Sequence, residues 1–306
     1  AQVRAPPGDR GPAKQPISSE QARAQKPAID WTQYEPPQPK QPGITVFDDY
    51  PLDELTAYID WSPFFSTWEL AGRYPGILDD AVVGEQARAL YADAKAMLKK
   101  IVTEKWLHAK AVVGLWPANS DGEDVVVYRD QETGARDSGE IDGNTTNAGS
   151  QVSKAAPITL HFLRQQAIKP MERGNLCLAD YIAPRVSGKR DWIGAFAVTA
   201  GLGIEEHVAR FEAAHDDYNA IMLKALADRL AEALAERMHQ RIRTELWGYA
   251  PNESLNNDAL IAERYRGIRP APGYPACPDH SEKHTLFDLL EAEANASIQL
   301  TESCAM

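Results

Sequence analysis

Hydrophobic residues recur at helical spacing in two long stretches of this chain. Between Val83 and Trp106 they fall three or four positions apart, with charged residues between them, which predicts an amphipathic helix. Between Tyr218 and Trp247 an apolar residue returns at every fourth position from Met222 onward. Because four residues exceed one helical turn of about 3.6, this stripe winds around the helix. We therefore predict that the second helix is substantially buried and central to the fold.

Short runs rich in β-branched residues predict strands elsewhere. One extended run begins at Ile44, and three more cover residues 111–116, 124–128 and 158–163. Such runs, separated by turn residues, are typical of neighbouring antiparallel strands. Before the last run, residues from about 129 to 157 are mostly Gly, Ser, Asn, Asp and Thr, with few side chains to bury. We predict a disordered insertion there.

The amino-terminal part of the chain has a different composition. Residues 1–43 contain nine prolines, too many for a helix or a central strand. We interpret this part as a proline-rich linker or arm. The rise in hydrophobic content after it predicts one ordered domain over residues 44–306.

Charge and cysteine usage narrow the possible partners and location. A formal net charge of -12 disfavours nucleic acid and anionic membranes, because affinity for polyanions comes largely from Lys and Arg. No apolar run approaches the roughly 18 residues of a membrane-spanning helix. The three cysteines are widely spaced and contain no Cys-x-x-Cys pair, which favours a reducing compartment. We expect a cytoplasmic protein without nucleic acid or membrane partners.

The long carboxyl-terminal helix carries an acidic stripe. Asp228, Glu232 and Glu236 follow one another at four-residue spacing, an arrangement that repels itself in an isolated helix. One interpretation is a solvated face that Lys224 and Arg229 partly neutralise. The other is a face that meets a cation from elsewhere, and the helix alone leaves both open.

A proline-rich segment follows that helix, from Gly267 to Pro278. Its four prolines exclude a helix, so we predict a stiff extended loop, which would hold its backbone groups still for a polar ligand. Arg269 offers a planar fork to a carboxylate, Gly273 allows close approach to the backbone, and Tyr274 offers a ring face and a hydroxyl. A purely structural turn would explain the same composition.

Residues Arg269–His280 read Arg-Pro-Ala-Pro-Gly-Tyr-Pro-Ala-Cys-Pro-Asp-His, and this run resembles the signature of one family, the activation domain of cobalamin-dependent methionine synthase. Further stretches resemble the same family in the same order: Tyr58–Phe65, Gly114–Asn119, Leu163–Gln166, Asp180–Pro184, Ala225–Glu232 and Leu300–Ser303. The resemblance runs from about residue 28 to the end. The family continues beyond its Leu-Thr-Glu-Ser stretch, so we expect this chain to be shorter at its carboxyl end.

The resemblance implies an α+β fold: a C-shaped single domain with a twisted antiparallel β-sheet flanked by helices. It also implies that this domain binds S-adenosylmethionine in a groove on its concave face. The cobalamin sits in a separate cobalamin-binding domain and sometimes becomes inactive cob(II)alamin. A flavodoxin-like or flavoprotein reductase then supplies an electron and S-adenosylmethionine supplies a methyl group. The resemblance therefore implies a methyltransferase module that restores methylcobalamin for methionine biosynthesis from homocysteine.

The resemblance also implies which residues contact S-adenosylmethionine. Asp60 and Arg269 match ligand-contacting positions, and the segment containing Ala271, Gly273 and Tyr274 matches the surroundings of the adenosyl group. Two nearby acidic positions match Glu232 and Glu263. The acidic residues would suit the sulfonium and ammonium groups, and Arg269 the carboxylate or the sugar edge. Because the cobalt atom itself attacks the methyl group, no side chain is expected to be catalytic.

Other patterns support weaker hypotheses. His280 and His284 are four residues apart, but the prolines before them favour a helix start over a metal site, and we expect no metal. Gly201 and Gly203 lack the third glycine of a dinucleotide-binding turn. Two alternatives to a ligand-binding reactivation module are open. One is a scaffold that docks cobalamin or reductase domains without binding ligand. The other is a free-standing methyltransferase that acts on some other acceptor, which would usually need a glycine-rich loop.

Overall fold

The computed structural model describes residues 17–129, 156–168, 174–274 and 276–305. The disordered insertion predicted at about 129–157 lies almost entirely outside these ranges, and so do residues 1–16 of the arm. Within the ranges that are described, no helix is long and apolar enough to cross a membrane.

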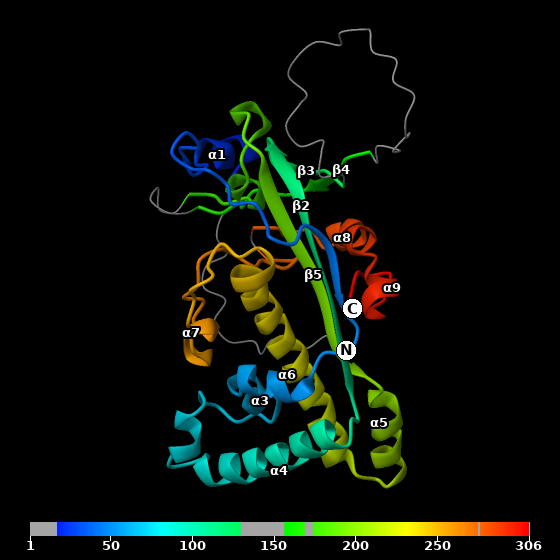
Figure 1. Cartoon of the computed structure of the whole chain (residues 1–306). Coiled ribbons are helices and arrows are strands. Elements are labelled where there is room, and N and C mark those ends of the chain that lie inside the picture. The colour runs from blue at the N-terminus through cyan, green and yellow to red at the C-terminus, as the bar shows by residue number, and fades with distance from the viewer. Residues whose placement is uncertain (1–16, 130–155, 169–173, 275, 306) are drawn as a thin grey trace, which may run out of the picture. The chain divides into compact units, whose positions relative to one another are not determined.

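The described residues combine helices with one sheet, as the α+β class predicts (Figure 1). The α-helices are α1 (Ser19–Ala24), α2 (Leu52–Leu55), α3 (Ser62–Thr67), α4 (Gly84–Thr103), α5 (Ile204–Ala213), α6 (Asp217–Arg241), α7 (Asn257–Ile261), α8 (Glu282–Leu290) and α9 (Ala292–Ala296). Tighter turns are η1 (Thr56–Tyr58), η2 (Gly76–Asp79), η4 (Leu178–Tyr181) and η5 (Arg185–Ser187), and η6 (Ile242–Leu246) is a wider π-turn. The strands are β1 (Gly43–Phe47), β2 (His108–Asp121), β3 (Asp124–Val127), β4 (Ile158–His161) and β5 (Asp191–Leu202).

The strands pair in the order β1-β2-β3-β4, and β5 also pairs with β2. The pairings of β1 with β2, β2 with β3 and β3 with β4 are antiparallel, which confirms the predicted arrangement. On β2, residues 111–115 pair with β1 and residues 118–121 pair with β3. Strand β5 and helix α5 are elements that the hydrophobic pattern did not predict.

The chain divides into two compact units, each made of three stretches of sequence. Unit 1 comprises residues 1–36, 117–193 and 270–282, and unit 2 comprises residues 37–116, 194–269 and 283–306. Strands β2 and β5 each contribute residues to both units. That residues 44–306 form one domain stays a prediction.

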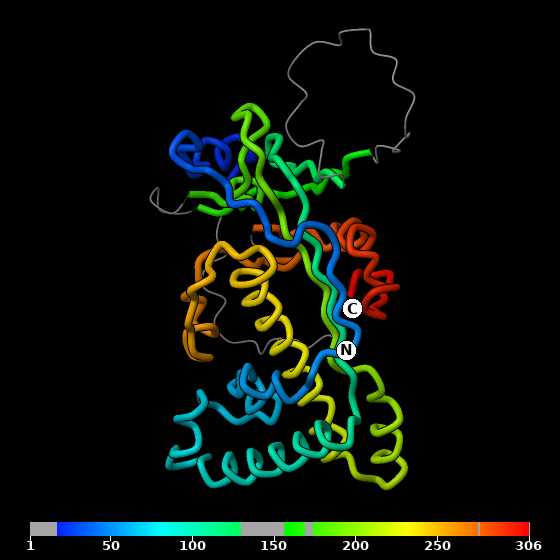
Figure 2. Tube along the Cα trace, viewed as in Figure 1, coloured from blue at the N-terminus to red at the C-terminus, as the bar shows by residue number. Residues whose placement is uncertain are grey.

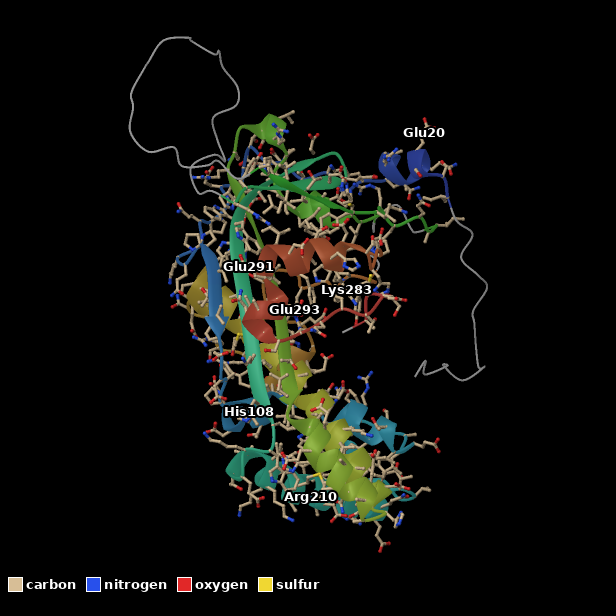
Figure 3. All side chains as sticks on the ribbon, turned by 90° about the vertical axis from the view of Figure 1, so that its right-hand side faces the viewer. Glu20, His108, Arg210, Lys283, Glu291 and Glu293 are labelled. Atoms are coloured by element: carbon tan, nitrogen blue, oxygen red, sulfur yellow. The ribbon has the colours of Figure 1, made fainter. Side chains whose placement is uncertain are left out.

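Helix α6 is the centre of unit 2. Met222, Leu226, Leu230, Leu234 and Met238 are fully buried along it, and helices α2, α3, α4 and α5 all contact it (Figure 1). The predicted amphipathic and central helices are thus confirmed as α4 and α6. Arg210 of α5 (Figure 3) has its guanidinium 4.9 Å from the centroid of the Trp106 ring.

Unit 1 includes a helix inside the proline-rich arm (Figure 2). Helix α1 is capped by Ser18, whose hydroxyl accepts a hydrogen bond from the Gln21 amide, while the Gln21 side chain accepts one from the Ser18 amide. The prediction that the arm contains no helix is therefore wrong for this stretch. The prolines at positions 16 and 27 flank α1 without interrupting it, and the reciprocal cap stabilises a short helix.

The arm is attached to the rest of unit 1 through ion pairs that converge on Arg164. This buried arginine binds both carboxylate oxygens of Asp180, at 2.6 and 2.7 Å, and donates from Nε to Glu123 at 3.0 Å. Arg23 of α1 also pairs with Glu123, at 3.1 Å, and Lys26 pairs with Asp180, at 3.4 Å. Residues 17–36 of the arm are therefore an ordered part of unit 1.

Candidate functional site

Arg269 of the proline-rich segment lies against helix α6 in unit 2. Its Nη2 donates to Oε2 of Glu236 at 2.9 Å, and Glu236 is only 8% exposed. Burial raises the pKa of Glu236, while Arg269 and Arg243 act in the opposite direction. The cation that the acidic stripe could meet is thus Arg269, and it meets the stripe at Glu236.

The other two residues of the stripe follow the solvated interpretation. Asp228 is exposed and pairs at 2.5 Å with its neighbour Arg229. Glu232, one of the predicted site residues, is exposed on the same helix. The solvated interpretation therefore holds for Asp228 and Glu232, although Lys224 pairs with Glu212 instead. The interpretation of a cation from elsewhere holds for Glu236.

The pair of Glu236 and Arg269 leaves two buried atoms without hydrogen-bond partners among the described residues. One is Oε1 of Glu236, an acceptor, and the other is Nε of Arg269, a donor. Buried polar groups without partners are uncommon because each loses its hydrogen bonds to water. A carboxylate is the kind of acceptor that complements the Arg269 donor.

A second arginine, Arg243, lies just after the carboxyl-terminal end of α6. Arg243, in the π-turn η6, is fully buried and forms two hydrogen bonds with Glu253, at 2.8 and 2.6 Å. Its Nη1 lies 2.7 Å from Nδ1 of His239, and its guanidinium lies 4.0 Å from the centroid of the Tyr265 ring. These contacts hold the segment from Glu253 to Tyr265 against α6.

The electrostatics of this cluster fix the charge of His239. Burial, followed by the nearby charges of Arg243 and Arg269, lowers the pKa of His239 to about 3. The imidazole is therefore neutral at pH 7, and its Nδ1 accepts the hydrogen bond from Arg243. Neither the pairing of Glu236 with Arg269 nor the cluster around Arg243 was predicted from the sequence.

Asp60 lies in unit 2 between η1 and α3. Its Oδ1 accepts a hydrogen bond from the Ser62 amide at 2.9 Å, at the start of α3. The preceding residue, Ile59, accepts a hydrogen bond from Nδ2 of Asn257 on α7, at 3.1 Å. Asp60 is half-buried, and its position is fixed from both sides.

Glu263 follows α7 with a left-handed backbone, φ 53°, and its side chain is exposed. Its charge contributes to raising the pKa of Glu236, so it belongs to the surroundings of the Arg269 pair. Of the predicted residues in unit 2, the structure thus brings Glu263 and Arg269 together. For Asp60 and Glu232 it gives no direct contact with them.

The remaining predicted residues lie in unit 1 and form interlocked turns. The Ala271 carbonyl accepts from the Tyr274 amide at 3.0 Å and from the Cys277 thiol at 3.0 Å. The Gly273 amide donates to the Cys277 carbonyl, and the Cys277 amide donates to the Tyr274 carbonyl, both at 2.9 Å. Tyr274 itself is exposed.

The predicted extended loop is therefore wrong in shape. Prolines exclude regular helix and strand, but they are compatible with tight turns, and the glycine at position 273 permits one. Gly273 has φ 105°, and a Cβ atom there would come within 2.3 Å of Cε1 of His280. Hydrogen bonds among Ala271, Gly273, Tyr274 and Cys277 restrain these turns.

The weaker hypotheses find simple structural explanations. His280 precedes helix α8, while His284 lies on it and approaches the Cys304 sulfur at 3.3 Å. In the described ranges no three His, Cys, Asp or Glu side chains gather as metal ligands would. Gly203 has φ 93° and lies at the N-cap position of α5.

Comparison with known proteins identifies a family and a closely similar solved structure. The family model for the vitamin B12 dependent methionine synthase activation domain matches residues 51–306. The crystal structure of the MetH reactivation domain bound to AdoHcy superimposes with a TM-score of 0.83 at 50% sequence identity. The match covers 95% of this chain and 83% of that one. At this identity the likeness extends beyond the fold to most of the sequence.

Proposed function

Since this chain belongs to the family of vitamin B12 dependent methionine synthase activation domains, we propose that it binds S-adenosylmethionine as the methyl donor that restores methylcobalamin. It is a module of a methyltransferase, and its own residues bind and orient the donor. The sulfonium of S-adenosylmethionine supplies the methyl group, which passes to a reduced cobalt held by a separate cobalamin-binding domain. The similar structure with bound AdoHcy, the product of that transfer, supports this proposal.

The proposal depends mainly on the burial and the hydrogen bonding of Arg269. A half-buried arginine is held at one nitrogen by Glu236 and keeps a buried Nε without a partner among the described residues. We assign this guanidinium to the carboxylate of the ligand, because arginine matches a carboxylate with two parallel hydrogen bonds. In unit 2, Asp60, Glu232 and Glu263 supply negative charge for the ammonium and sulfonium groups.

In unit 1, we assign the turns at Ala271, Gly273 and Tyr274 to the adenosyl group. Gly273 lets a ligand approach the backbone, and the exposed ring of Tyr274 offers an apolar face. None of these residues needs to transfer a proton, because methyl transfer from a sulfonium leaves a neutral thioether. Their contribution is orientation and the exclusion of water.

The partners and the location complete the proposal. The module would meet the cobalamin-binding domain and a flavodoxin-like or flavoprotein reductase, which supplies one electron to cob(II)alamin before the methyl transfer. A cytoplasmic location is supported by three cysteines that are free thiols. A formal net charge of -12 remains unfavourable for polyanion binding.

The test is equilibrium binding of S-adenosylmethionine to the full chain and to Arg269→Ala. We expect the variant to bind more weakly by about 1.5–3 kcal/mol, the range for a hydrogen bond to a charged group. Arg264→Ala, an exposed arginine five residues earlier, is the matched control and should bind as the parent does. Equal affinity of Arg269→Ala and the parent would favour the scaffold alternative.

A further inference from the structure

Glu236 is a buried carboxylate on helix α6. It lies on α6 with 8% of its surface exposed, and burial raises its pKa. Burying a carboxylate is unfavourable unless a cation and hydrogen bonds compensate. A buried glutamate whose Oε1 has no partner among the described residues therefore needs an explanation beyond packing.

The neighbouring cation in the cluster does not supply that explanation. Arg243 bonds to both oxygens of Glu253 and to Nδ1 of His239, so its guanidinium is already engaged along two edges. His239 is neutral because its pKa lies at about 3. Glu263 carries a like charge and opposes ionisation of Glu236. Among these groups the hydrogen bond to Glu236 comes from Arg269.

The bond from Arg269 also constrains its own guanidinium. A guanidinium is planar, so fixing Nη2 against a buried carboxylate restricts where Nε and Nη1 point. Arg269 is 25% exposed in its side chain, yet its Nε is buried without a partner among the described residues. Glu236 thus holds Nη2, the Tyr265 side chain also hydrogen-bonds to Arg269, and only the exposed quarter of the Arg269 side chain is open to a ligand.

We propose that Glu236 is a positioning residue that sets the guanidinium of Arg269 for the carboxylate of the ligand, and so makes the module selective for ligands that carry this carboxylate. The inference rests on the proposed function and deepens it. The cluster of His239, Arg243 and Glu253 holds the chain that leads to Arg269 on α6, and Glu236 then orients the guanidinium itself.

The test compares three ligands on the full chain: S-adenosylmethionine, S-adenosylhomocysteine and decarboxylated S-adenosylmethionine. Glu236→Gln should weaken the first two by about 10-fold, the effect of losing one charge-assisted hydrogen bond. Affinity for the decarboxylated ligand should stay unchanged. In the Arg269→Ala background, Glu236→Gln should have no further effect, because the residue it positions is gone.

Glu245→Gln is the matched control. Glu245 accepts a hydrogen bond from Arg241 at 2.8 Å in an exposed pair one turn beyond α6, and its loss should leave all three affinities unchanged. If Glu236→Gln does not fold, which the urea midpoint reveals, Glu236→Asp retains the charge at a shorter reach and should show the same selective loss.

The outcomes separate the inference from the function on which it rests. If the parent chain binds none of the three ligands, the proposed function itself fails. If the parent binds and Arg269→Ala weakens binding while Glu236→Gln does not, the function stands and the positioning role is overturned. An equal loss for all three ligands would mean that Glu236 only maintains the fold, and would also overturn it.

Discussion

Arg243 has no exposed surface, and its neighbours explain how unit 2 tolerates a buried charge. Glu253 neutralises it, His239 accepts from a third nitrogen, and the ring of Tyr265 covers one face. Each partner satisfies a different part of the guanidinium. The arrangement is stable only while it is complete, because any remaining member would be buried without its partner.

Arg243→Met should therefore destabilise the protein by about 3–5 kcal/mol, since it leaves Glu253 buried without a cation. The measurement is urea unfolding followed by circular dichroism at pH 7. Lys224→Met is the control, because its pair with Glu212 is more than half exposed on both sides and such pairs contribute little. A loss below 1 kcal/mol for Arg243→Met would show that the cluster reorganises at low cost.

His239 predicts a pH dependence of stability. Its pKa is lowered to about 3 in the folded state against about 6.5 in an unfolded chain, so the unfolded state binds more protons between these values. Stability then falls as pH drops below about 6.5, by about 2 kcal/mol from pH 7 to pH 5. Unfolding midpoints of the parent and of His239→Gln, which keeps an acceptor for Arg243, measure this.

The variant should lose clearly less stability than the parent over that pH interval. Identical losses in the parent and in His239→Gln would mean that titratable groups other than His239 cause the acid sensitivity.

Among the elements, those with long regular patterns were predicted best. Helix α6 carries its apolar repeat over its whole length, and α4 has a clear apolar face. The spacing of apolar residues along the sequence was therefore enough to predict both helices. Strand β5 was missed because Gly194 and several alanines dilute its β-branched residues. In unit 2, Gly194 has a steric role, because a Cβ atom at this position would lie 2.9 Å from Cδ2 of Leu115.

The candidate site was predictable only in part. The motif around Arg269 identified that residue and the turns after it, but not the partner of Arg269. Glu236 lies 33 residues away along the chain, and its spacing on α6 is the same as that of the exposed Asp228 and Glu232. A tertiary contact decided between the two interpretations of the stripe, and no local pattern encodes it.

The turns of the proline-rich segment make a prediction at the scale of the element. Gly273→Ala combines an unfavourable φ of 105° with a clash against the His280 ring, and should cost about 1–3 kcal/mol of stability. Gly188→Ala is the control, since Gly188 has φ 67° but nothing within 4 Å of its added Cβ. Thermal unfolding of both variants is the measurement, and equal effects would mean that the His280 contact is unimportant.

At the scale of the whole molecule, the question is whether the two units unfold together. Strands β2 and β5 each contribute residues to both units, so unfolding one unit removes part of a strand that the other uses. We expect a single cooperative transition. Tryptophan fluorescence and circular dichroism should give the same urea midpoint, and two separated midpoints would contradict the prediction of one domain.

The central claim is that this chain binds S-adenosylmethionine, and calorimetric titration of the full chain with that ligand tests it most directly. We predict saturable heat with one ligand per chain, and binding of S-adenosylhomocysteine in a parallel titration. A chain that unfolds cooperatively in urea, and is therefore folded, but gives no saturable heat with either ligand would contradict the claim.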